Sequence, residues 1–188
     1  MTTPGTHPLD SQFIMSDLRY PVGRFSPPAS VTPELRLGFI DAIAAAPDHL
    51  RAAIRGLDED KLDAPYRPDG WTVRQVVHHV PDSHLNAYVR LKLALTEPRP
   101  TIRPYDEAQW ARLPDSTAVP VDVSIALLEA LHRRWVALLR AMTPDDFARE
   151  YIHPESGRHT VDHLVALYAW HGRHHVAHIT ALRERMGW

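Results

Sequence analysis

The clearest indication of the fold class is residues 122–142, which read DVSIALLEALHRRWVALLRAM. Large apolar side chains recur in this stretch at steps of three or four residues, the spacing that places side chains on one face of an α-helix. The apolar stripe consists of Ile125, Leu128, Leu131, Trp135, Leu138 and Met142. The stretch therefore predicts one amphipathic helix, which must bury its apolar stripe against other elements.

Three further helices are predicted, over residues 32–56, 72–95 and 160–186. Each begins at a threonine, whose hydroxyl can accept a hydrogen bond from a free backbone N–H group of the first turn. At Thr72 this cap is completed by Gln75, three residues later, in a capping box. Four helices without an alternating strand pattern predict an all-α fold, a four-helix bundle.

Two proline-rich segments lie outside these helices. Residues 1–31 contain five prolines and no apolar periodicity, which predicts an extended N-terminal arm preceding a helical domain of residues 32–188. Within the arm, Met15 offers an alternative start of translation, and residues 1–14 are expected to be dispensable. Residues 98–120 contain five more prolines and predict a long connection that can cross the bundle.

The composition excludes several classes of protein. The 188 residues fit one domain, and 21 Lys and Arg against 23 Asp and Glu give a net charge of −2. A chain so nearly neutral lacks the basic surface typical of nucleic-acid or membrane-surface binding, so we expect a small-molecule partner. The sequence shows neither a membrane-spanning apolar run nor a secretory signal, and a cytoplasmic location is expected.

The chain has no cysteine, which excludes disulfides, thiolate nucleophiles and cysteine-ligated zinc. Any metal site must therefore be built from carboxylates and from the 13 histidines. The stripe of the last helix that is predicted to face the core consists of Leu164, Leu167, Tyr168, His171, His175, His178 and Leu182. A buried imidazole without a partner costs about 1–3 kcal/mol, so clustered inward histidines need a shared partner, and a divalent metal ion is one.

The spacing of the histidines suits a metal site. His171 and His175 lie one helical turn apart, so that both rings can bind the same ion. A third ligand must come from another helix, and His78 and His79 of the second helix are the best sources. We favour His79, which is three residues from the apolar Val76, although periodicity barely separates the two.

Two residues are candidates for the base that hydrolysis requires. Asp82 is three residues beyond His79 and can face the same cavity, although an aspartate on a helix is more often solvated. His178 is expected not to bind the metal directly, and to be a base, a proton relay or a core histidine bonded to a carbonyl. His174 is offset from the stripe and is expected at the surface or beside the ligands. Five further histidines are expected to face solvent or to cap helices: His49, His132, His153, His159 and His163.

Several longer motifs resemble one known family. Residues 71–79 read WTVRQVVHH, residues 82–86 read DSHLN, and residues 168–179 read YAWHGRHHVAHI. Together with YPVG at residues 20–23, they resemble the YfiT branch of the DinB-like superfamily, in the same order along the chain. The resemblance extends from about residue 20 to the C-terminus and is far more specific than a pair of histidines four residues apart.

The resemblance implies a four-helix bundle with a long crossover, which binds zinc or nickel through one histidine of the second helix and a histidine pair of the fourth. Carried over to this sequence, the ligands are His79, His171 and His175, with zinc expected before nickel. The family commonly has alanine at the position of Pro81, which is expected to kink the second helix beside His79. Relatives form homodimers, and the resemblance implies the same here.

The chemistry of such a site allows three functions. Members of the branch are described as metal-dependent hydrolases, and zinc held by three neutral histidines can activate water for attack on a small electrophile. Related members are S-transferases that join a low-molecular-weight thiol such as bacillithiol to an electrophile, and the same ligands would serve a thiol. A non-catalytic metal or small-ligand binding module is the third. We place hydrolysis slightly ahead of thiol transfer.

Overall fold

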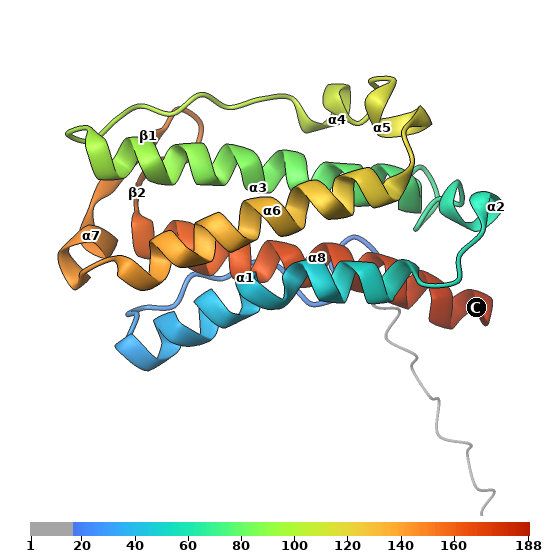
Figure 1. The fold of residues 1–188 in the computed structure, drawn as a ribbon, viewed down its shortest axis with the longest axis horizontal. Helices are drawn as coiled ribbons and strands as arrows, with labels where there is room; N and C mark the ends of the chain where they lie inside the picture. Colours follow the sequence, from blue (N-terminus) through green and yellow to red (C-terminus); the bar gives the residue numbers. More distant parts are fainter. Residues whose placement is uncertain (1–16) are drawn as a thin grey trace, which may run out of the picture.

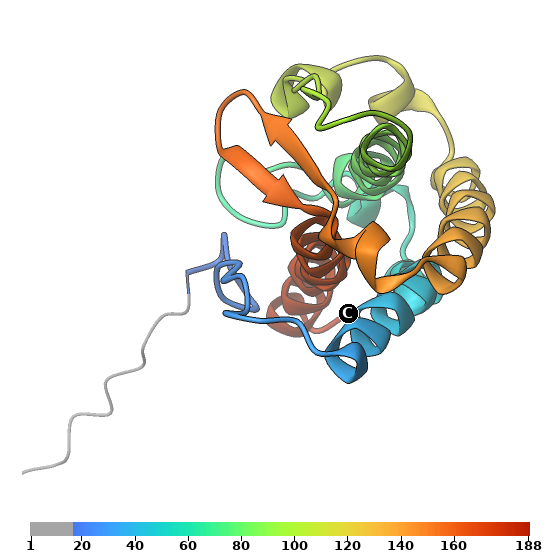
Figure 2. The same ribbon diagram turned by 90° about the vertical axis from the view of Figure 1, so that its left-hand side faces the viewer.

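The structure is a computed structural model that describes residues 17–188, and it shows the predicted four-helix bundle (Figure 1). Viewed along the bundle, four long helices surround one core (Figure 2), and each packs against two of the others. The long helices are α1 (Pro33–Ile54), α3 (Val73–Thr96), α6 (Val121–Ala141) and α8 (Val161–Met186). The short helices of this part of the chain are α2 (Glu59–Leu62), α4 (Glu107–Trp110), α5 (Asp115–Ala118) and α7 (Pro144–Ala148).

The long crossover that the sequence predicts joins α3 to α6. Residues 97–120 carry α4 and α5 and return the chain to the end of the bundle at which α3 begins (Figure 1). As a result α3 and α6 run in the same direction, and α1 and α8 run together in the opposite one. This arrangement places α3 beside α8, the two helices on which the candidate ligands lie.

The predicted helix starts are confirmed by their hydrogen bonds. The hydroxyls of Thr32 and Thr160 each accept a hydrogen bond from a backbone N–H three residues later, both at 3.2 Å. Thr72 and Gln75 form the complete capping box, at 3.1 and 2.9 Å. Pro81 lies inside α3, and the helix continues through it to Thr96.

A short β-hairpin precedes α8, an addition to the helical bundle that the sequence pattern does not reveal. Strand β1 (Glu150–His153) pairs antiparallel with β2 (Gly157–Thr160), in a register that sets His153 opposite Gly157. Each strand has only four residues, and Tyr151 is the one side chain of the two strands that is buried. Strands this short and exposed carry no apolar alternation, which is why the sequence pattern does not reveal them.

The core is apolar along most of its length but contains a group of histidines. Two apolar clusters fill the bundle, one around Trp135 and one around Leu128, both fully buried. Among the residues that the structure describes, seven histidines are also buried, which are His78, His79, His84, His132, His174, His175 and His178. Buried polar side chains require hydrogen-bond partners or ligands, so these histidines are where function is sought.

Residues 17–32 contain no helix or strand and lie against α8 (Figure 2). The indole Nε1–H of Trp170 donates to the backbone carbonyl of Gly23 at 3.2 Å, and the ring of Phe25 packs beside it. The expectations for Met15 and residues 1–14 lie outside the described residues. Within residues 17–188, no helix is both long enough and apolar enough to cross a membrane.

Candidate metal centre

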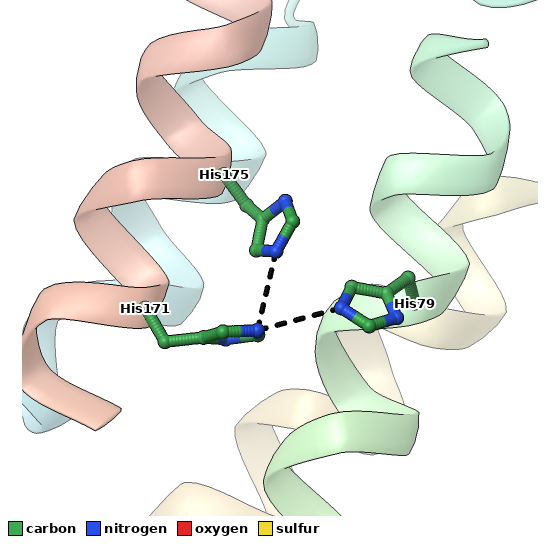
Figure 3. Close-up of side chains that lie close together, drawn as sticks. All are labelled: His79, His171 and His175. Carbon is green, nitrogen blue, oxygen red and sulfur yellow. Dashed lines mark hydrogen bonds between the residues drawn. The ribbon is translucent and has the colours of Figure 1, made fainter. Parts of the chain in front are cut away.

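Three histidines from two helices converge on one point. His79 lies on α3, and His171 and His175 lie one turn apart on α8, with their rings turned toward one another (Figure 3). The Nε2 atom of His171 is 3.4 Å from Nε2 of His79 and 3.1 Å from Nε2 of His175. These are the three residues chosen from the sequence, and the packing of α3 on α8 brings them together.

The separations fit a tetrahedral ion. Zinc binds histidine nitrogen at about 2.0–2.1 Å, so two nitrogens at tetrahedral positions are about 3.3 Å apart. The distances of 3.1 and 3.4 Å from Nε2 of His171 lie on either side of that value. Three convergent imidazole nitrogens are also a donor set that suits zinc and nickel. The residues present therefore fit a divalent metal.

The three imidazoles are uncharged at neutral pH. Burial lowers the pKa of His79 to about 4, and burial together with the neighbouring imidazoles holds the pKa of His171 and His175 well below the ordinary value. A neutral imidazole keeps one lone pair, which is the form that binds a metal. The site is thus prepared for a cation without any proton being displaced at pH 7.

His78 has a different environment from His79. Its Nδ1 lies 2.7 Å from the hydroxyl of Ser124, and its Nε2 donates to the carbonyl of Val119 at 3.0 Å. Both nitrogens are therefore occupied between α3 and the start of α6. Of the two adjacent histidines, it is His79 that lies with His171 and His175.

His174 and His178 extend the histidine cluster. His174 is only 7% exposed, so the alternative of a surface position is wrong, and its ring stacks on Trp170 with centroids 4.3 Å apart. The Nε2 of His178 lies 3.1 Å from the backbone carbonyl of Arg19, and its ring stacks on Tyr66. Nitrogens of His174, His175 and His178 also lie within 4.8 Å of one another. His178 thus contacts the arm and stands beside the three convergent histidines.

Asp82 stands apart from this group. It is half-buried, and its pKa is raised to about 6 by burial and, to a lesser extent, by Asp115. It is not among the residues that line the cleft over the three histidines, whereas the adjacent Ser83 is. The Ser83 hydroxyl lies 3.4 Å from Nε2 of His171. The structure therefore places serine, and not aspartate, beside the convergent nitrogens.

Two buried histidines were not recognised as part of the site from the sequence. His132 was expected to face solvent or cap a helix, but it is 2% exposed, and His84 is fully buried. His84 lies 3.1 Å from His171 and 2.8 Å from His132, measured between ring nitrogens. The burial of His132 could have been predicted from its spacing, because it follows Leu128 by four residues and precedes Trp135 by three. His132 therefore lies on the same apolar stripe of the helix as these two residues.

A cleft of about 900 Å³ opens over the three convergent histidines. This is within the usual range for a small-molecule site. Its walls come from the arm, the segment before α3, the helices α3, α4 and α8, and the hairpin. His153, His159 and His163 line it rather than facing only solvent. It also contains aromatic and charged side chains, among them Tyr20, Tyr66, Trp71, Tyr151, Tyr168, Arg19, Arg67, Arg90, Asp69 and Glu107.

A four-helix bundle with three histidines converging beneath a cleft defines a class of metal-dependent proteins. The chain belongs to the DinB superfamily, whose family model matches residues 42–179. It is also similar to YfiT from Bacillus subtilis, described as "a probable metal-dependent hydrolase with an unusual four-helix bundle topology". The two structures agree with a TM-score of 0.89 and 47% sequence identity, over 91% of this chain and 98% of that chain.

Curated relatives match over nearly the whole chain. A protein of Bacillus mycoides is 55% identical over 174 residues, which is 93% of this chain and 100% of the relative. A protein of Bacillus cereus is 54% identical over the same length. Both carry the name "putative metal-dependent hydrolase". The family resemblance seen in the sequence motifs is thereby confirmed.

Proposed function

We propose that His79, His171 and His175 hold one divalent metal ion, zinc in preference to nickel, and that the protein hydrolyses a small electrophilic substrate. The observation that carries this proposal is the convergence of three Nε2 atoms beneath a cleft of small-molecule size. Zinc bound by three neutral histidines keeps its double charge and an open position, and it supplies Lewis acidity that makes water reactive near pH 7.

The protein contributes a rigid, pre-oriented ligand set. His171 and His175 are held by one helix, and His79 is covered by the ring of Trp71, whose centroid is 4.7 Å from that of the imidazole. Ligands fixed on packed helices lose little conformational entropy on binding an ion. Aromatic side chains, among them Tyr66, Trp71 and Tyr168, line the cleft and offer apolar contact area to a small substrate.

We assign His178 rather than Asp82 as the base, because His178 lines the cleft and Asp82 does not. The Nε2–H of His178 donates to the carbonyl of Arg19, so the remaining lone pair is on Nδ1. This Nδ1 has no hydrogen-bond partner among residues 17–188. An imidazole with a free lone pair beside the convergent histidines can take up the proton that hydrolysis releases.

Thiol transfer is the second candidate, and the arginines in the wall of the cleft support it. Arg19, Arg67 and Arg90 lie in the cleft wall, where they can orient an anionic thiol compound. The guanidinium Nε of Arg90 is buried and has no hydrogen-bond partner in the described part of the chain. An unpaired buried donor of this kind is expected to bind an acceptor oxygen of a ligand.

One set of assays tests these proposals together. The metal content of the purified protein is measured, and the loaded protein is then offered ester and amide substrates and, separately, an alkylating electrophile with and without a low-molecular-weight thiol. We expect one ion per chain and metal-dependent cleavage of an ester or amide. Conjugate that forms only with thiol and metal, while esters and amides stay intact, would replace hydrolysis by thiol transfer. Stoichiometric metal without turnover in any assay would identify a binding module.

A further inference from the structure

Three imidazoles form a line of hydrogen bonds that runs from the candidate metal centre into the core. The Nδ1 of His171 lies 3.1 Å from Nε2 of His84, and the Nδ1 of His84 lies 2.8 Å from Nε2 of His132. The Nδ1 of His132 lies 2.6 Å from the backbone carbonyl oxygen of Ile43. The line crosses the whole bundle, because these four residues belong to α8, α3, α6 and α1 in turn.

The carbonyl at the far end sets the direction of every hydrogen bond in the line. A carbonyl oxygen only accepts, so Nδ1 of His132 must carry a proton. Burial lowers the pKa of His132 to about 4, so the ring is neutral and its Nε2 has the lone pair. His84 must therefore donate from Nδ1 and accept at Nε2, and by the same reasoning His171 donates from Nδ1. The lone pair of His171 is left on Nε2, the atom that faces His79 and His175.

We propose that His84 and His132 are positioning residues for the metal site, which fix His171 in the Nδ1–H tautomer and so direct its Nε2 lone pair at the cation. This inference rests on the proposed function, since it concerns how one of the proposed ligands is prepared. Groups that hydrogen-bond to the far nitrogen of a ligating histidine orient the ring and raise its basicity, and their loss typically lowers metal affinity about 10- to 100-fold.

The packing around the line holds the rings in these orientations. His84 stacks on His132 with ring planes inclined by 21° and meets the ring of Tyr168 edge-on. At Gly172 an added Cβ would lie 3.8 Å from Cε1 of His84 and 3.2 Å from the Cβ of Ala46, so α8 is already close to α1 there. The line also ends on a carbonyl, which cannot take up a proton, so its role is orientation and not proton export.

The chain offers a matched set of variants to test this. His132→Phe removes both hydrogen bonds of His132, so that nothing accepts the Nδ1–H of His84. His132→Gln restores them in principle, because an amide has an oxygen to accept from His84 and an N–H to donate to Ile43. His78→Phe is the control, since His78 is also buried and hydrogen-bonded through both nitrogens but does not belong to the line.

Two measurements are made on each protein. The first is the tautomer of His171 in the metal-free protein at pH 7.5, from nitrogen-15 NMR of the ring nitrogens, assigned by loss of the signals in His171→Gln. The second is zinc affinity, from competition with a chromophoric chelator, with folding checked by circular dichroism. We expect Nδ1–H in the wild-type protein and in His78→Phe. We expect a mixture of tautomers with about 10- to 100-fold weaker zinc binding in His132→Phe, and recovery in His132→Gln.

The proposal is overturned if wild-type His171 carries its proton on Nε2, a measurement that depends on no variant. It is also overturned if folded His132→Phe keeps both the tautomer and the zinc affinity of the wild-type protein. A wild-type protein that binds no zinc but shows Nδ1–H at His171 would instead contradict the proposed function and leave the hydrogen-bond line in place. The two failures are thus distinguishable.

Discussion

The Nδ1 atom of His171 is 3.1 Å from Nε2 of His84, while Nε2 of the same ring faces His79 and His175. One imidazole therefore belongs both to the candidate metal centre and to the hydrogen-bonded interior of the bundle. Substitutions at the cleft and substitutions deep in the core are expected to affect the same property, the binding of a cation, by different routes.

Replacement of His79, His171 or His175 by alanine should reduce the metal content of the purified protein from one ion per chain to near zero. Each substitution removes one of three ligands, and a site with two histidines binds zinc too weakly to survive purification. Metal content is measured by mass spectrometry against protein concentration. His174→Ala serves as the control and should keep its metal, and full stoichiometry in His171→Ala would contradict the ligand set.

Substitution of His178 should lower turnover without removing the metal. His178→Gln can still donate to the carbonyl of Arg19 but has no basic nitrogen, so kcat is expected to fall by about 10²- to 10⁴-fold. Metal content, measured in parallel, should be unchanged. Asp82→Asn is the comparison, expected to have little effect; if it abolishes turnover while His178→Gln does not, Asp82 is the base after all.

The metal-free protein should lose stability as the pH falls from 7.5 toward 4. The pKa of His79 and of His132 in the folded protein is about 4, below the value near 6.5 expected when unfolded. Between these values the unfolded chain binds more protons, so the free energy of unfolding decreases by up to about 1.4 kcal/mol per pH unit for each such histidine.

Urea denaturation of the metal-free protein at several pH values measures this effect. His132→Gln should show a shallower decline than the wild-type protein, because it has one buried histidine fewer. His49→Gln, which replaces an exposed histidine, is the matched control. A free energy of unfolding that is constant between pH 7.5 and 5 would contradict the assignment of neutral buried histidines.

Two truncations of the arm are expected to differ in their effect on the melting temperature. Removal of residues 1–14 is expected to leave the melting temperature nearly unchanged. Removal of residues 1–25 should lower it, because the carbonyls of Arg19 and Gly23 accept hydrogen bonds from His178 and Trp170. Calorimetry of the two truncated proteins gives the comparison, and a large drop on removing residues 1–14 alone would contradict the first expectation.

Much of the fold could be predicted from local sequence because its main elements are long and well capped. The threonines that begin three of the four long helices and the apolar stripe of residues 122–142 act within one helix, so no knowledge of neighbours is needed. The hairpin was missed for the opposite reason. Its four-residue strands are stabilised by each other and by the crossover, because the N–H of Ile152 in β1 donates to the carbonyl of Pro100 and the carbonyl of Ile152 accepts from the N–H of Ile102.

Only part of the candidate site could be predicted from the sequence, because the rest depends on how the helices pack. The spacing of His171 and His175 on one helix predicts both as ligands. His79 is favoured weakly by periodicity and more strongly by the family motif. The apolar stripe of residues 122–142 already indicates that His132 faces the core, but its hydrogen bond to His84 depends on how α3 and α6 pack and cannot be predicted from local sequence. The exclusion of Asp82 from the cleft likewise follows from tertiary packing.

The line of imidazoles across the bundle also bears on why these four helices adopt only one arrangement. Apolar burial has no direction, so another order of the same helices could cover the apolar stripes about as well. Such an arrangement would separate His171, His84, His132 and the carbonyl of Ile43, which come from four different helices. Each buried donor or acceptor left without a hydrogen-bond partner would destabilise that arrangement by about 1–3 kcal/mol. The buried histidines therefore favour one arrangement of the four helices, and it is the same arrangement that brings His79, His171 and His175 together.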